Sequence, residues 1–235
     1  MKERKPAYRP FMSKFLELQS AMIIHNAGLT EKHPYQSAPH TWPLVLGGIS
    51  FWTKDDLKQQ IYLLANPFGW WLSDLALLIY PTLILADLLA RQRGLEAIDE
   101  PVRGRFYRSG GFLILGWVFH YLPFFFMGRS LFLHHYLPAC IIGYLAVGII
   151  HQFACIPGID QLSKTVSSTD AAKGPPAFYR AIAPPIAWIT AILIVAGQLG
   201  FFWYFRPPTY GDVSLTQEEW TARKWIPGWN FHFAS

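Results

Sequence analysis

The chain has 235 residues, of which 52% are apolar and 17% aromatic, whereas only 15% are charged, with a net charge of +5. A soluble domain averages about 25% charged residues. The composition therefore excludes an ordinary soluble domain and favours a membrane protein with polar segments at its ends.

The first 67 residues form a polar flank that begins with a helical pattern. Phe11, Phe15, Leu18 and Met22 recur at helical spacing, and Gly28 is suited to end a helix. We expect a helix with one apolar stripe, lying on the membrane or on other protein.

Residues 42–67 carry a strand pattern on both sides of the polar stretch TKDDLKQQ. Alternating and β-branched residues separated by a short polar segment are typical of a β-hairpin. The residues that give this pattern are Val45, Ile49 and Phe51 before the polar stretch, and Ile61, Tyr62 and Leu63 after it.

Apolar runs long enough to cross a bilayer, which takes about 20 residues, occur in four places. They lie at roughly 68–90, 110–127, 135–156 and 185–205. We expect Pro81, Pro123 and Pro138 to bend or end helices, because proline removes a backbone donor.

The C-terminal flank, 206–235, contains a capping pattern for a short helix. Thr216 and Glu219 have the spacing of a capping box, and Arg223 and Lys224 precede Pro227. We expect this helix to rest at the membrane interface with tryptophans on its apolar side.

Together these patterns predict an all-α membrane fold with four transmembrane helices, amphipathic helices in both flanks and a small β-hairpin. The chain divides into a flank at 1–67, a four-helix region at 68–205 and a tail at 206–235.

Positive charge concentrates in the loops at 91–109 and 157–184. Cytosolic loops are enriched in Lys and Arg, so we place both loops in the cytosol, and the turn at 128–134 and both termini on the other side. Adjacent membrane spans favour this interpretation over a nucleic-acid surface. The cationic residues are Arg91, Arg93, Arg103, Arg105 and Arg108 in the first loop, and Lys164, Lys173 and Arg180 in the second.

This orientation requires the first 67 residues to cross the membrane, although no apolar span precedes them. Either the orientation is inverted or the chain is the end of a longer protein. We expect the second.

The densest polar and aromatic cluster lies in the non-cytosolic turn, at Arg129, His134, His135 and Tyr136. An arginine at headgroup level can hold a phosphate by paired hydrogen bonds, and the neighbouring rings could donate further bonds. The alternative is an arginine that snorkels to the interface among interfacial aromatics. No cysteine or carboxylate lies nearby in sequence, so we do not expect a metal site.

Ionisable residues inside the spans are candidates for a functional role. Asp74 lies near the outer end of the first span, where it could pair with Arg129 or make a hydrogen bond within the bundle. His120 lies near the middle of the second span. Asp87 and His151 lie near cytosolic ends, where we expect solvent to satisfy them.

Pairs of carboxylates, which glycosyl transfer commonly uses, occur at Asp55–Asp56, Asp99–Glu100 and Glu218–Glu219. None is placed beside Arg129 by the predicted topology. If the protein is an enzyme, we expect its general base to lie outside this chain.

Several motifs resemble the protein O-mannosyltransferase family in the same order along the chain. They are FLELQSAMIIHNAGLTEKHPYQSAPHTWP, then GISFW and QIYLLANPFGWW, then HHYLPA at 134–139 and TYGDVSLTQEEW at 209–220. The resemblance covers roughly residues 11–230 and corresponds to the C-terminal four-span region of that family.

The resemblance implies an endoplasmic reticulum membrane protein with several spans and both termini in the lumen. It implies transfer of mannose from dolichyl phosphate mannose to Ser or Thr of acceptor proteins, with no cofactor. It also places the turn from Arg129 to Tyr136 toward the cavity for the lipid phosphate. The family's catalytic Asp-Glu pair belongs to an N-terminal region outside this chain, so the chain alone should be inactive.

The partners implied are this N-terminal region and a second family member in a dimer. Two other functions remain open. One is a non-catalytic membrane scaffold or partner subunit. The other is a small transporter, which is disfavoured because the spans show no inverted repeat.

Overall fold

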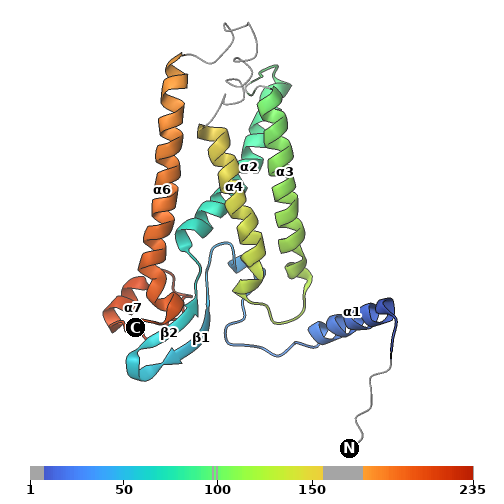
Figure 1. Cartoon of the computed structure of the whole chain (residues 1–235), viewed down its shortest axis with the longest axis vertical. Helices are drawn as coiled ribbons and strands as arrows, with labels where there is room; N and C mark the ends of the chain where they lie inside the picture. The colour runs from blue at the N-terminus through green and yellow to red at the C-terminus, as the bar shows by residue number, and fades with distance from the viewer. Residues whose placement is uncertain (1–7, 97, 99, 156–176, 235) are drawn as a thin grey trace, which may run out of the picture.

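The computed structural model describes residues 8–234 except 97, 99 and 156–176. Long helices run side by side, and a β-hairpin with a short helix gathers at one end of them (Figure 1). An N-terminal helix lies beside the same end.

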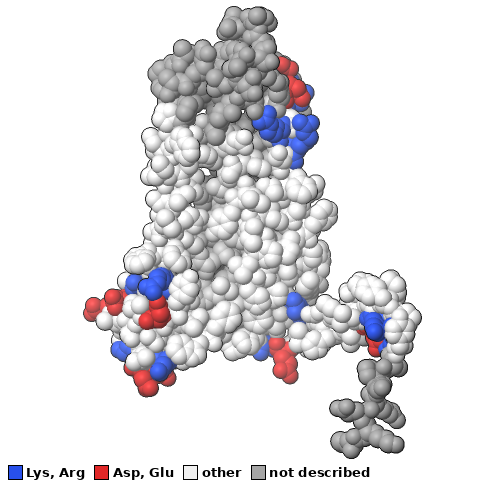
Figure 2. Space-filling model, viewed as in Figure 1, with Lys and Arg blue, Asp and Glu red and all other residues white. Residues whose placement is uncertain are grey.

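The long helices are α2 (Pro67–Gln92), α3 (Glu100–Tyr121), α4 (Leu137–Cys155) and α6 (Ala177–Tyr210). Within the described residues, four segments are long and apolar enough to cross a membrane, and they lie in these helices: Pro67–Gln92, Val102–Phe126, Leu133–Cys155 and Pro185–Tyr210. The four predicted spans are therefore confirmed. On the face drawn in Figure 2, Lys, Arg, Asp and Glu gather toward the two ends and leave an uncharged belt between them.

One boundary differs from the sequence prediction. We expected the second span to begin at 110 after an arginine-rich loop, but α3 already begins at Glu100. Arg103, Arg105 and Arg108 therefore lie on the helix. The reason is that Arg103 is buried against Asp87 of α2, a tertiary contact that hydropathy does not record. The predicted loop at 157–184 lies largely outside the described residues, as does Asp99.

The prolines act at helix boundaries in two of three cases. Pro123 lies in the 3-10 turn η3 (Leu122–Phe126) that follows α3, and Pro138 lies in the first turn of α4. Pro81 lies inside α2, which continues through it. At the start of α2, the Asn66 side chain accepts a hydrogen bond from the backbone N–H of Gly69, which caps the helix.

The predicted hairpin is present as strands β1 (Ile49–Lys54) and β2 (Gln59–Leu63), joined by the 3-10 turn η2 (Asp55–Leu57). The strands pair antiparallel from Ile49 opposite Leu63 to Lys54 opposite Gln59, with an irregularity between Ser50 and Trp52. The polar stretch therefore forms the turn, as predicted.

The capped C-terminal helix is α7 (Gln217–Arg223), and Thr216 and Glu219 form the predicted capping box. That this helix rests at the membrane interface stays a prediction, but the structure shows what it packs on. Trp220 is fully buried, and its indole Nε1 donates to the carbonyl of Lys58 at 3.1 Å. The helix thus packs on the hairpin.

Helix α1 (Phe11–Ala27) ends at Gly28, as predicted, and none of its residues is buried. A further 3-10 turn, η1 (Pro39–Thr41), leads into the buried residues Trp42 and Val45. The core of the molecule lies where this segment, the hairpin, α7 and the ends of the long helices meet.

Candidate functional site

The turn between α3 and α4 carries the sequence-predicted cluster. After η3, the chain passes through Arg129 and enters the 3-10 turn η4 (Leu133–Tyr136), which leads directly into α4. The short η4 segment places His134 and His135 side by side, with ring centroids 4.4 Å apart and nearly parallel planes. His134 is exposed, whereas His135 is part-buried.

Arg129 is the centre of this cluster. One terminal nitrogen, Nη1, donates to Oδ1 of Asn26 at 3.0 Å, and the other, Nη2, lies 2.9 Å from Nε2 of His135. A guanidinium has five N–H donors, so three remain beyond these two contacts. Among the described residues Arg129 makes no salt bridge to a carboxylate.

His135 holds Arg129 through a specific proton arrangement. Its Nε2 faces an arginine donor, so Nε2 is the acceptor and Nδ1 carries the proton in the neutral ring. Nδ1 lies 2.9 Å from the carbonyl oxygen of Phe132, which can accept that proton, and 3.1 Å from the backbone nitrogen of the same residue. In the tautomer that accepts from Arg129, His135 orients the guanidinium as a neutral ring.

The segment after α1 is tied to this turn by backbone hydrogen bonds. Ser130 N–H donates to the Leu29 carbonyl at 3.1 Å, and Ser37 N–H donates to the Leu131 carbonyl at 2.8 Å. Asn26, in the last turn of α1, is therefore brought to Arg129. Sequence reasoning did not single out Asn26, although it lies within one of the motifs that carry the resemblance.

Tyr136 faces the bundle rather than the outer surface. It is fully buried, accepts a hydrogen bond from Trp117 Nε1 at 3.0 Å and donates to Asp74 Oδ1 at 3.4 Å. Asp74 therefore contacts Tyr136 and not Arg129, contrary to one of the two pairings considered for it. A hydrogen bond within the bundle, the other alternative, is the one formed. The second oxygen of Asp74 is buried without a partner in the described part of the chain.

The remaining ionisable residues in the spans have partners within the protein, although Oδ1 of Asp87 is buried without one among the described residues. Asp87 is buried, and its Oδ2 accepts from Arg103 Nε at 3.0 Å and from Tyr107 at 2.7 Å, so the expectation that solvent satisfies it is wrong. His151 Nε2 lies 2.8 Å from the Thr190 hydroxyl. His120 Nε2 is 3.4 Å from the His135 carbonyl, which adds support behind the cluster.

The carboxylate pairs lie away from Arg129. Asp55 and Asp56 are in the hairpin turn, where Asp55 is 3.3 Å from His232. Glu219 caps α7, and the hydrogen bonds from Thr216 hold the pKa of its carboxyl below the usual value. The described residues contain no group of three His, Cys, Asp or Glu that could hold a metal ion.

Comparison with protein families matches residues 11–229 to the C-terminal four TMM region of protein-O-mannosyltransferase. The chain is 43% identical to dolichyl-phosphate-mannose–protein mannosyltransferase 4 of Schizosaccharomyces pombe, over 99% of this chain and 30% of that protein. It is 34% identical to protein O-mannosyl-transferase 1 of Mus musculus, over 94% of this chain and 27% of that protein.

A solved structure has the same fold. It is the S. cerevisiae protein O-mannosyltransferase Pmt1-Pmt2 complex bound to the sugar donor, with a TM-score of 0.74 and 30% identity. The match covers 100% of this chain and 29% of the other. The chain thus spans less than a third of the length of these relatives.

Proposed function

The chain belongs to the protein O-mannosyltransferase family as its C-terminal membrane region, and from this premise we propose that it forms one wall of the donor-lipid cavity of a complete enzyme. That enzyme would transfer mannose from dolichyl phosphate mannose to Ser or Thr of proteins in the lumen of the endoplasmic reticulum.

The proposed reaction is a displacement at the anomeric carbon. The acceptor hydroxyl oxygen forms a new bond to this carbon and gives its proton to a carboxylate, while the bond from the carbon to the phosphate oxygen breaks. Dolichyl phosphate leaves with the electron pair and gains negative charge. The carboxylate base would come from the region outside this chain, as the family resemblance implies.

The observation that carries the proposal is the orientation of Arg129. Asn26 and His135 fix its guanidinium at the outer turn with three N–H donors left over. A cation held in advance at the place where phosphate charge develops stabilises a transition state without further reorganisation. His134, exposed beside it, would supply another donor to the phosphate.

Tyr136 and Asp74 would support the turn from inside the bundle. The Tyr136 hydroxyl is occupied by Trp117 and Asp74, so the contact with phosphate proposed for this cluster falls to Arg129 and the histidines. Because Tyr136 is anchored directly before α4, the two histidines that precede it are held in place next to Arg129.

The test is Arg129→Ala in the full-length enzyme, assayed in microsomes by mannose transfer from dolichyl phosphate mannose to an acceptor peptide. Losing one preorganised donor group costs about 10²–10³ in turnover where it stabilises developing charge. We expect a loss of that order at unchanged protein level, with partial retention in Arg129→Lys, which keeps the charge but not the planar geometry.

Arg206→Ala is the matched control, since Arg206 also lies at the outer end of a span but pairs with Asp212. It should retain normal turnover. Normal turnover of Arg129→Ala would reject the phosphate role.

We also propose a second family member as partner and an endoplasmic reticulum location with both termini in the lumen. The similar solved structure is a complex of two family members, which supports the partner. Co-purification of differently tagged family members from detergent extracts would test it, and glycosylation acceptor sites inserted at each terminus would test the orientation.

A further inference from the structure

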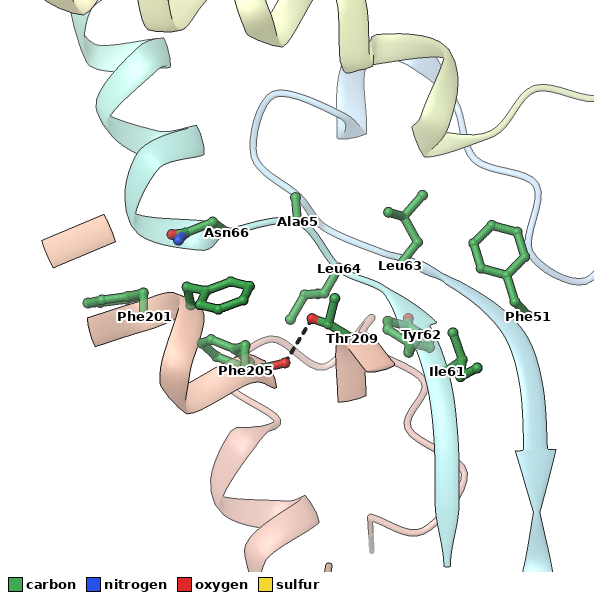
Figure 3. A pocket seen from close by; sticks show the side chains of 11 residues that line it. Phe51, Ile61, Tyr62, Leu63, Leu64, Ala65, Asn66, Phe201, Phe205 and Thr209 are labelled. Atoms are coloured by element: carbon green, nitrogen blue, oxygen red, sulfur yellow. Dashed lines mark hydrogen bonds between the residues drawn. The ribbon is translucent and has the colours of Figure 1, made fainter. Parts of the chain in front are cut away.

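A cavity of about 340 Å³ lies between the hairpin and the outer end of α6. Its lining comes from β1, from β2 and the residues that follow it, and from the last turns of α6 (Figure 3). The lining residues are Phe51, Ile61–Asn66, Phe201, Phe202, Phe205 and Thr209.

The polar groups of this lining are turned to partners within the protein. The Tyr62 hydroxyl accepts from the backbone N–H groups of Gly48 and Asn230, at 3.0 and 3.1 Å. The Asn66 amide donates to the Gln198 carbonyl at 2.8 Å. The Thr209 hydroxyl donates to the Phe205 carbonyl at 2.8 Å, as the dashed line in Figure 3 marks.

Because the polar side-chain groups bond to other parts of the protein, the cavity presents a largely apolar surface to a ligand. Burial raises the pKa of the Tyr62 hydroxyl, which therefore stays neutral at physiological pH. A charged or strongly polar ligand would lose hydration in the cavity and find few groups to replace it. The lining therefore selects a hydrocarbon ligand.

The cavity borders a stretch of α6 that is apolar and exposed in the described chain. None of the most apolar window of its span, Pro185–Tyr210, is buried inside the protein. Leu199 and Trp203 are 62% and 72% exposed, and Phe202, which lines the cavity, is 42% exposed. Hydrocarbon chains next to this surface can reach the cavity without passing through water.

We propose that this cavity binds the acyl chain of a membrane phospholipid. Phospholipids are the solvent of an exposed span, so their chains are the hydrocarbon present in excess beside α6. A chain that moves from bilayer hydrocarbon into an apolar cavity gains no hydrophobic transfer energy, so its binding rests on dispersion contacts with the cavity walls. The aromatic rings of α6 give the chain a fixed wall of this kind. The bound lipid would seal the junction between the hairpin and α6.

The test uses the full-length enzyme in nanodiscs of phosphatidylcholine that contain a small share of phosphatidylcholine with a diazirine in one acyl chain. After photolysis, mass spectrometry of peptides should find labels at 61–66 and 201–209. Thr209→Trp fills the cavity from its rim. It should remove most of the labelling there, because the indole takes up the space of the acyl chain.

Val195→Trp is the matched control, because Val195 is 56% exposed on the same helix and lies outside the cavity lining. Labelling of the cavity should be unchanged in it. Thr209→Leu fills less of the cavity. It serves as the second test variant if Thr209→Trp does not fold and so does not elute as a single species.

Three results would overturn the proposal. One is equal labelling of the cavity in wild type and in both Thr209 variants. A second is the absence of label from both peptides, which would mean that protein covers the cavity. The third is loss of the label when polyprenyl phosphate is added, which would assign the cavity to an isoprenoid chain. Turnover is not the readout, so failure here is separate from failure of the proposed enzyme function.

Discussion

The indole Nε1 of Trp229 donates a hydrogen bond to the carbonyl oxygen of Val45 at 2.6 Å, joining segments 184 residues apart. Both residues are fully buried. Val45 has a φ of 52°, which is unusual for a β-branched residue. Next to this contact, a Cβ on Gly228 would lie 2.0 Å from the Leu46 carbonyl oxygen, so the two backbones approach as closely as glycine permits. The C-terminal tail therefore holds the segment before the hairpin in place.

We predict that Trp229→Ala lowers the free energy of unfolding of this region by about 3–5 kcal/mol, the usual cost of truncating a large buried aromatic. Trp229→Phe keeps most of the apolar burial but leaves the Val45 carbonyl without its donor, at a cost of about 1–3 kcal/mol. Thermal unfolding of the purified enzyme in detergent, with limited proteolysis after the hairpin, would measure both.

Trp225→Phe is the control, because Trp225 is 45% exposed and donates to the nearby Ala222 carbonyl. It should change stability little. A Trp229→Phe variant as stable as Trp225→Phe would show that the Val45 contact does not anchor the tail.

Local sequence patterns were sufficient for the elements that depend on local chemistry. The Thr216–Glu219 capping box, the polar hairpin turn and the four apolar spans each follow from residues close together in the chain. The hydrogen-bond partners of ionisable side chains could not be predicted in the same way. Asp74 and Arg129 lie at the same end of the bundle, yet they do not pair with each other. Asp74 bonds to Tyr136, whereas Arg129 bonds to Asn26 and His135.

The start of α3 shows why side-chain partners cannot be predicted from the order of residues along the chain. Arginines ordinarily mark the end of an apolar span, and hydropathy therefore placed Arg103 in a loop. A carboxylate on the neighbouring helix makes a buried arginine favourable, and Asp87 supplies it 16 residues earlier. Only the packing of α2 on α3 brings the two together.

The Tyr80 ring of α2 packs directly on the backbone of α3 at Gly110. A Cβ at this position would lie 1.9 Å from a ring carbon of Tyr80, too close for any side chain. We predict that Gly110→Ala destabilises the bundle by about 1–3 kcal/mol, as overpacking usually does. The melting temperature of the purified enzyme in detergent would measure it.

Gly111→Ala is a neighbouring control on the same helix. Its Cβ would lie 3.6 Å from the Tyr80 hydroxyl, an ordinary contact distance. Alanine also has the better helix propensity, so this variant should be as stable as wild type or more so. Equal melting temperatures for both variants would contradict the close approach of the two helices.

The ion pair between Asp87 and Arg103 should be costly to break from one side. Their side chains are 1% and 6% exposed. Loss of Arg103 leaves the Asp87 charge buried without its ion pair, and loss of Asp87 leaves Arg103 paired only with the exposed Glu100. We predict that Asp87→Leu and Arg103→Met each lower the melting temperature and the amount of enzyme in the membrane. The double variant Asp87→Leu with Arg103→Met should recover part of the loss.

Melting temperatures of the two single variants and the double variant form a double-mutant cycle that isolates the pair. Arg93→Met, at the C-terminal end of α2, is the control for loss of an arginine nearby. Additive effects of the two single substitutions would show that the pair contributes no coupling.

The capping box of α7 should give this helix a pH dependence. The backbone N–H and the hydroxyl of Thr216 donate to Glu219 at 2.8 and 3.0 Å, and these bonds lower the pKa of its carboxyl. Because the pKa is lower in the folded chain than in the unfolded chain, folding favours the ionised form. This contribution is present above the unfolded pKa of about 4.3 and is lost as the pH falls through the folded value.

We therefore predict that amide hydrogens of 217–223 exchange faster, once corrected for intrinsic rates, as the pH falls below about 4, the range in which glutamate takes up its proton. Glu219→Gln should remove most of this pH dependence, since its amide has no charge to lose. Glu218→Gln, on the same helical turn, should retain it because Glu219 and Thr216 are unchanged. If Glu219→Gln and wild type show the same pH dependence, the Glu219 cap is not its source, and another acidic group near α7 must titrate in this range.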